Sequence, residues 1–259
     1  MPFADLPNAR IHYALSGNEN SPTLILSNSL GTNFSMWDAQ IAAFEKRFRV
    51  LRYDKRGHGQ SSVPPSPYSV SELTGDILAL ADFLRIDRFH FCGLSIGGMI
   101  GMTLALQSSE RLHKLVLCST AAKIGTRESW NTRIETVRTQ GMQAIARATP
   151  ERWFTPGFIA KSPEVIPAIM QAIAAMNPEG YIGGCGAVRD FDAQTRVSQI
   201  RVPALVISAT HDPAAPPSAG QFLTGHIPGS RYAELNASHI ANIEDAANFT
   251  PKVLDFLSE

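Results

Sequence analysis

A serine flanked by glycines is the first chemical signal in the sequence. The segment Gly93–Gly97 has the pattern G-x-S-x-G around Ser95, with an apolar run before it and a helical run after it. A sharp strand-to-helix turn leaves little room beside its central residue, and glycines two positions away meet that need. Such a turn exposes the hydroxyl and points the following helix N-terminus at the reacting centre. The pattern therefore predicts Ser95 as a nucleophile; the alternative is a glycine-rich junction with a buried serine.

A histidine base is the next requirement, because a serine hydroxyl is a poor nucleophile until its proton is taken. His239 follows the last apolar run and precedes the C-terminal helical segment. Folds that carry this serine turn have the chain order serine, acid, histidine, and His239 leaves room for an acid in between. His58 lies between two glycines after an earlier strand and is the second candidate.

The acid that orients the imidazole is expected at Asp212. This residue follows the apolar run Ala204–Ser208 and precedes a proline, so it falls in a loop at the end of a strand. Asp190 and Asp192 are rivals, although they do not follow a core strand. A turn or helix-cap role is the other interpretation of Asp212.

Two backbone N–H groups are expected to stabilise the oxyanion that forms on the substrate. One belongs to Ile96, directly after the nucleophile. The other is expected from Leu30, in the loop that follows the run Thr23–Ser27.

The elements that must position these groups are visible in the sequence as short apolar runs, which alternate with segments whose apolar residues have helical spacing. Continuous apolar strands between helices indicate a mostly parallel sheet covered on both faces. The more alternating Ala9–Ala14 fits an antiparallel hairpin at the sheet edge. The predicted strands are Thr23–Ser27, Arg49–Tyr53, Phe89–Gly93, Lys114–Ser119, Ala204–Ser208 and Ser230–Leu235, and the predicted helices include Ser71–Leu84 and Ile96–Gln107.

The alternation lapses over residues 121–194, a stretch too long for an ordinary loop. Its helical segments are broken by prolines and rich in Arg, Met and Trp. We therefore predict an α/β core formed by residues 1–120 and 195–259, with 121–194 inserted as a helical cap over one end of the sheet.

Composition excludes several classes of protein. The 23 Lys and Arg balance the 23 Asp and Glu, which disfavours a nucleic-acid binder. No apolar run approaches the roughly 18 residues of a membrane span, and the N-terminus lacks secretory signal features. The three cysteines show no metal or redox spacing, so we expect buried thiols in a soluble, cytoplasmic protein with no metal or other cofactor. The oligomeric state stays open, and a homo-oligomer is compatible with the sequence.

The order of these motifs resembles the α/β-hydrolase superfamily over nearly the whole chain. Within it, the chain is most similar to 3-oxoadipate enol-lactonases. The closer match rests on Leu26–Thr32, Gly93–Gly101, Ala121–Gly125 and, more loosely, Tyr181–Asp190. The resemblance implies an α/β-hydrolase fold and hydrolysis of 3-oxoadipate enol-lactone to 3-oxoadipate in the β-ketoadipate pathway of aromatic catabolism.

An anionic lactone as the small-molecule partner would need a local cation, because the chain has no net charge. Trp130 and Arg133 share one helix face at spacing i, i+3 and are the first candidates. Arg189 is the second candidate, with a surface pair to Asp190 or Asp192 as the alternative. A carboxylesterase or carbon–carbon bond hydrolase with the same three residues, and a non-catalytic binding protein on the same scaffold, are the competing functions.

Overall fold

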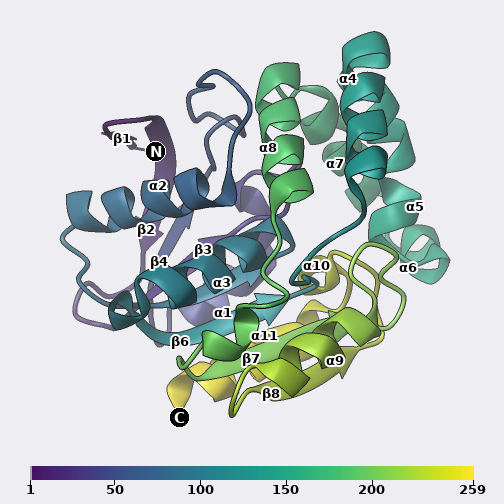
Figure 1. The fold of residues 1–259 in the computed structure, drawn as a ribbon. Helices are drawn as coiled ribbons and strands as arrows, with labels where there is room; N and C mark the ends of the chain where they lie inside the picture. Colours follow the sequence, from purple (N-terminus) through teal and green to yellow (C-terminus); the bar gives the residue numbers. More distant parts are fainter. Residues whose placement is uncertain (1) are drawn as a thin grey trace.

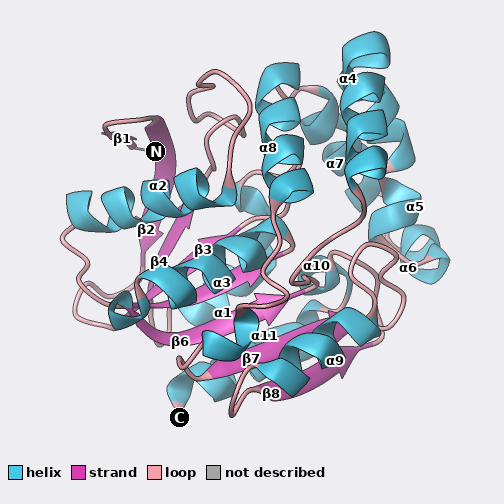
Figure 2. Cartoon of the chain, in the orientation of Figure 1, coloured by secondary structure: helices cyan, strands magenta, loops and turns pink. Residues whose placement is uncertain are grey.

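Eight strands form a single sheet in the computed structural model, which describes residues 2–259 (Figures 1 and 2). The strand order is β1-β2-β4-β3-β5-β6-β7-β8. The strands are β1 (Phe3–Asp5), β2 (Arg10–Ser16), β3 (Thr23–Ser27), β4 (Arg49–Tyr53), β5 (Phe89–Leu94), β6 (Leu112–Cys118), β7 (Ala204–Ala209) and β8 (Arg231–Leu235).

The hairpin of β1 and β2 lies at one edge of the sheet. Its two strands are antiparallel to each other, and β2 is antiparallel to β4. The strands β3 to β8 all run parallel to one another. Every residue of β3, β5 and β7 is buried, which explains their continuous apolar sequences. The edge strand β8 is more exposed. The predicted edge hairpin and mostly parallel sheet are confirmed.

Helices cover both faces of this sheet. Helices α2 and α3 lie together in front of it in Figure 1, while α1 and α11 pack on each other behind it. The core helices are α1 (Asp38–Phe44), α2 (Val70–Phe83), α3 (Ile96–Gln107), α9 (Pro217–His226), α10 (Ala241–Glu244) and α11 (Ala246–Ser258), with short 3₁₀ turns that include η1 (Phe34–Trp37).

Five further helices stand together beyond one end of the sheet (Figure 1). They all fall within the stretch predicted as a helical cap. They are α4 (Arg127–Ala148), α5 (Pro150–Trp153), α6 (Pro156–Lys161), α7 (Val165–Ala174) and α8 (Pro178–Asp190). Helix α4 is interrupted at Gly141, where φ is +69°.

Helix α8 rests directly on core loops through a face rich in glycine. A Cβ atom added at Gly180 would lie 2.1 Å from the carbonyl oxygen of Gly57, so only glycine allows this approach. The backbone N–H of Tyr68, in the core, also donates to the carbonyl of Gly183. Backbone therefore meets backbone where this cap helix joins the core.

The three cysteines are free and buried, as predicted, and the sulfurs of Cys92 and Cys118 lie 3.9 Å apart on adjacent strands. Within residues 2–259, no helix combines the length and apolar character that crossing a membrane requires.

Candidate active site

Ser95 lies at the sharp junction between β5 and α3. Its backbone has φ +60° and ψ −118°, a conformation that residues other than glycine rarely adopt. A Cβ atom added at Gly93 would lie 2.1 Å from the carbonyl oxygen of Gly97, so the flanking glycines allow the chain to fold this tightly. The predicted turn is therefore present, and it holds the hydroxyl at the carboxyl end of the sheet.

A histidine–aspartate pair occupies the same edge of the sheet. Nδ1 of His239 lies 2.8 Å from Oδ2 of Asp212, and both side chains are buried. The other carboxylate oxygen accepts the backbone N–H groups of Ala214 and Ala215 at 2.8 and 3.0 Å. An ionised carboxylate can only accept hydrogen bonds, so Nδ1 donates to it, and in the neutral imidazole Nε2 then carries the lone pair. This is the tautomer that a general base requires.

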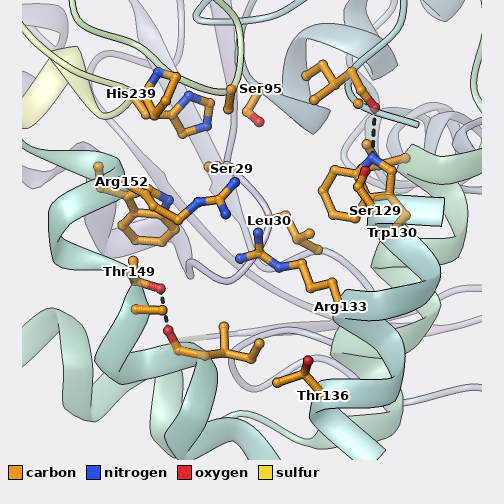
Figure 3. Close-up of a pocket in the computed structure, with 18 of the residues that line it drawn as sticks. Ser29, Leu30, Ser95, Ser129, Trp130, Arg133, Thr136, Thr149, Arg152 and His239 are labelled. Carbon is orange, nitrogen blue, oxygen red and sulfur yellow. Dashed lines mark hydrogen bonds between the residues drawn. The ribbon is translucent and has the colours of Figure 1, made fainter. Parts of the chain in front are cut away.

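Ser95 and His239 line one cavity of about 460 Å³ beneath the cap helices. Figure 3 shows their side chains next to each other at one end of it. Ser29 and Leu30, from the loop after β3, line the same cavity. The strand order accounts for this convergence, because β3, β5, β7 and β8 are parallel and their carboxyl ends share one edge.

The two predicted oxyanion donors also lie at this edge. Ile96 is the first residue of α3, and the first N–H groups of a helix have no acceptor within it. Leu30, in the loop after β3, lines the same cavity as Ser95. The roles of these N–H groups stay predictions.

Trp130 and Arg133 line the cavity from α4, on the face that their spacing predicted. Nε of Arg133 donates to the hydroxyl of Tyr181 at 2.7 Å, and its guanidinium carbon is 5.6 Å from the centre of the Trp130 ring. The Trp130 indole N–H donates to the carbonyl of Ile124 at 2.7 Å. These contacts hold a guanidinium beside aromatic rings within reach of the cavity.

Arg152 is a cavity residue that the sequence did not point to. It comes from the short helix α5, and Figure 3 shows its guanidinium facing that of Arg133 across the pocket. Burial and the charge of Arg133 lower the pKa of this guanidinium. The arginine–carboxylate ion pairs within residues 2–259 are made by other arginines. Two cations therefore share the cavity without an acidic partner.

Arg189 does not reach this cavity, which corrects its candidacy for substrate binding. Its guanidinium is paired with the carboxylate of Asp190 at 2.7 Å and donates to the side chain of Asn131 at 3.0 Å. It borders a separate hollow beside Pro67. The surface pair considered from the sequence is the arrangement found.

The rival catalytic candidates are engaged elsewhere. His58 is buried, and burial lowers its pKa to about 3. Asp190 pairs with arginines, and Asp192 pairs with Lys123 at 2.9 Å. None of the three lines the cavity that contains Ser95. Within residues 2–259 no group of three or more His, Cys, Asp or Glu side chains is arranged to hold a metal ion.

The profile of the α/β hydrolase fold family matches residues 22–246, and the chain belongs to this family. The family and the relatives that it matches identify it as a hydrolase. It is 43% identical to 3-oxoadipate enol-lactonase 2 of Acinetobacter baylyi over 94% of this chain and 91% of that protein. It is 35% identical to 3-oxoadipate enol-lactonase 1 of the same organism over 91% of this chain and 88% of that protein.

A solved structure gives the same relationship in three dimensions. The enol-lactonase from Burkholderia xenovorans superposes with a TM-score of 0.98 at 48% identity, and all of both chains is covered. The fold class predicted from the sequence is therefore confirmed, as is the resemblance to enol-lactonases.

Proposed function

We propose that this protein hydrolyses 3-oxoadipate enol-lactone to 3-oxoadipate, within the β-ketoadipate pathway, through an acyl-enzyme on Ser95. Enol-lactonases match the chain over nearly its whole length. The observation that carries the proposal is the pair of arginines without acidic partners in the cavity of Ser95 and His239. A neutral ester has no use for such a pair, whereas a lactone with a carboxylate does.

In the first half-reaction, Ser95 Oγ attacks the lactone carbonyl while His239 Nε2 takes its proton. Asp212 stabilises the imidazolium that results. The oxygen that becomes negative receives hydrogen bonds from the N–H groups of Leu30 and Ile96. The bond between the carbonyl carbon and the ring oxygen then breaks, and His239 returns the proton to the departing oxygen.

The leaving group is an enol, which departs more easily than an ordinary alkoxide but remains tethered to the acyl-enzyme. Conversion of this enol to its ketone removes the nucleophile that would close the ring again. His239 then activates water, which attacks the acyl carbon and releases the second carboxylate together with the free Ser95 hydroxyl. The reaction consumes one water and needs no cofactor.

The substrate carboxylate is assigned to the arginine side of the cavity. Arg133 is oriented by Tyr181 and Trp130, so its guanidinium is held in place before the ligand arrives. Arg152 faces it from α5. We also propose that residues 121–194, which supply both arginines, form the unit that sets specificity on the core of residues 1–120 and 195–259.

The test compares the enol-lactone with a neutral p-nitrophenyl ester. Replacing Arg133 by Met should raise KM for the lactone by about 10–100-fold, since a charge-assisted bond to the carboxylate is lost, and change KM for the ester by less than about threefold. Arg189→Met is the matched control, because this cap arginine is paired with Asp190, and it should alter neither value. Equal effects of Arg133→Met on both substrates would contradict the assignment.

Ser95→Ala distinguishes an enzyme from a binding protein in the same assay. The variant should lose turnover of both substrates and labelling by a fluorophosphonate while it keeps its melting temperature. A wild-type protein that hydrolyses only the neutral ester would be a carboxylesterase. A wild-type protein that hydrolyses neither and takes no label would be a binding protein.

A further inference from the structure

A lysine is buried directly behind the loop that carries Leu30. Lys55 follows β4 and is 1% exposed. Its Nζ donates to the carbonyl oxygens of Asn28 and Ser29, each at 3.0 Å. Burying an ammonium group costs free energy unless polar groups compensate for the lost water. Burial lowers the pKa of Lys55 to about 7, although the neighbouring Asp54 opposes the shift. A side chain kept in such an environment calls for an explanation.

The explanation lies in the peptide group that Lys55 contacts. The carbonyl of Ser29 and the N–H of Leu30 belong to the same planar unit, and in a trans peptide they point in opposite directions. The ammonium lies on the carbonyl side, so the Leu30 N–H points away from Lys55. The Leu30 N–H has no backbone acceptor within residues 2–259, as a donor reserved for a ligand requires.

Thr32 reinforces the same peptide. Its Oγ1 donates to the Ser29 carbonyl at 2.8 Å, so this oxygen accepts from two side chains. Hydrogen bonds at a carbonyl polarise the peptide and make its N–H a stronger donor. When Lys55 is protonated, its positive charge behind the peptide adds a direct attraction for negative charge that forms in front of it.

We propose that Lys55 is the positioning residue of the oxyanion hole, which orients and polarises the Ser29–Leu30 peptide toward the tetrahedral intermediate. The proposal rests on acyl transfer at Ser95 but not on the identity of the lactone. Its test therefore uses a neutral p-nitrophenyl ester. A protein without lactonase activity would overturn the proposed substrate and leave the role of Lys55 testable.

Lys55→Met removes the donors and the charge at similar volume. We expect kcat to fall about 100-fold, as on loss of an oxyanion donor, with KM within about threefold of the wild type. The affinity for an arylboronic acid, whose tetrahedral adduct places a charged oxygen in the hole, should fall by a similar factor. Lys55→Gln keeps N–H donors without the charge, and its kcat should be about tenfold higher than that of Lys55→Met. Lys252→Met, at an exposed position, is the control and should change nothing.

Two outcomes would overturn the proposal. One is a folded Lys55→Met variant with kcat and boronate affinity close to the wild type. The other is a Lys55→Met variant whose kcat and melting temperature both fall while its boronate affinity stays unchanged. That result would mean that Lys55 only holds the loop in place.

Thr32→Val provides the second test if Lys55→Met does not fold. Thr32 is only half-buried, and this change removes one of the two side-chain donors to the Ser29 carbonyl. We expect kcat and boronate affinity to fall together by about three- to tenfold, and Thr32→Ser to restore both. Full activity and affinity in Thr32→Val would contradict polarisation of this peptide.

Discussion

Two buried histidine–aspartate pairs in this molecule have nearly the same geometry. His12 Nδ1 lies 2.8 Å from Asp54 Oδ2, and His239 Nδ1 lies 2.8 Å from Asp212 Oδ2. All four side chains are at most 5% exposed. Judged by this contact alone, either pair could orient a general base.

Both carboxylates are also held by backbone N–H groups. Asp54 accepts from Phe34 at 2.9 Å and from Gln60 at 3.0 Å, and Asp212 accepts from two residues of its own loop. The support on the acid side is therefore similar in the two pairs, and it does not distinguish a catalytic pair from a structural one.

The surroundings of the imidazole make the difference. The ring of His12 contacts those of Phe3 and Phe34, with both centroids 5.0 Å away. The ring of His239 faces a cavity that also holds Ser95. The first pair ties the edge hairpin to the loop after β4, whereas the second leaves a basic nitrogen beside a hydroxyl. Access to a nucleophile, rather than the pairing itself, separates the two.

The largest effect expected is the loss of activity in His239→Ala. We expect kcat to fall by about 10⁶-fold, because the base and the acid of both half-reactions are lost together. The same change at His12 should leave kcat within about threefold but lower the melting temperature by roughly 5–15 °C, since Asp54 becomes a buried charge without its partner. Steady-state kinetics and thermal unfolding of both variants check this. If His12→Ala remained folded but inactive, the distinction between the pairs would be wrong.

Substitutions of Asp212 and Asp54 should differ in their effect on kcat in the same way as those of the two histidines, but by a smaller factor. Asp212→Asn should reduce kcat by about 10⁴-fold, because the amide favours the wrong imidazole tautomer. Asp54→Asn should lower kcat by less than about tenfold. Its main effect should be a lower denaturant midpoint of unfolding. Similar losses of kcat in both variants would show that Asp54, like Asp212, supports a catalytic base.

His58 gives the smallest effect and extends the comparison to a histidine without a carboxylate partner. Its pKa is about 3 in the folded protein against an ordinary value of 6.5, so the unfolded chain binds the proton first as the pH falls. The free energy of unfolding should therefore decrease below pH 6.5, by about 2 kcal/mol at pH 5 from this group. The decrease continues until the pH approaches 3. Urea titrations of the wild type and His58→Gln should show a shallower decrease in the variant, and identical slopes would contradict the assignment.

Much of the site could be predicted because it depends on strand order and local turns. Ser95, Asp212 and His239 each follow a parallel strand, and parallel strands bring their carboxyl ends to one edge. Two core strands, Thr23–Ser27 and Arg49–Tyr53, even have the predicted bounds. Trp130 and Arg133 were predictable for a similar reason, since spacing within one helix determines which residues share a face.

Contacts between separate cap helices could not be predicted in this way. Arg152 comes from α5 and Arg189 from α8, and only packing decides which of them faces the cavity. Lys55 had a signal, a charged residue two positions after a buried strand, but nothing in its spacing reveals that it reaches the carbonyl of Ser29.

The contact between α8 and the core has a consequence for protein engineering. Because Gly180 brings its backbone against Gly57, this side of the cap cannot accept a larger residue without lifting away from the core. Libraries of variants intended to accept new acyl groups should therefore leave the sequence of α8 unchanged. They should vary the cavity-facing positions of α4, such as Thr136. In this molecule the residues that α4 contributes to the cavity can be varied while α8 keeps its contact with the core.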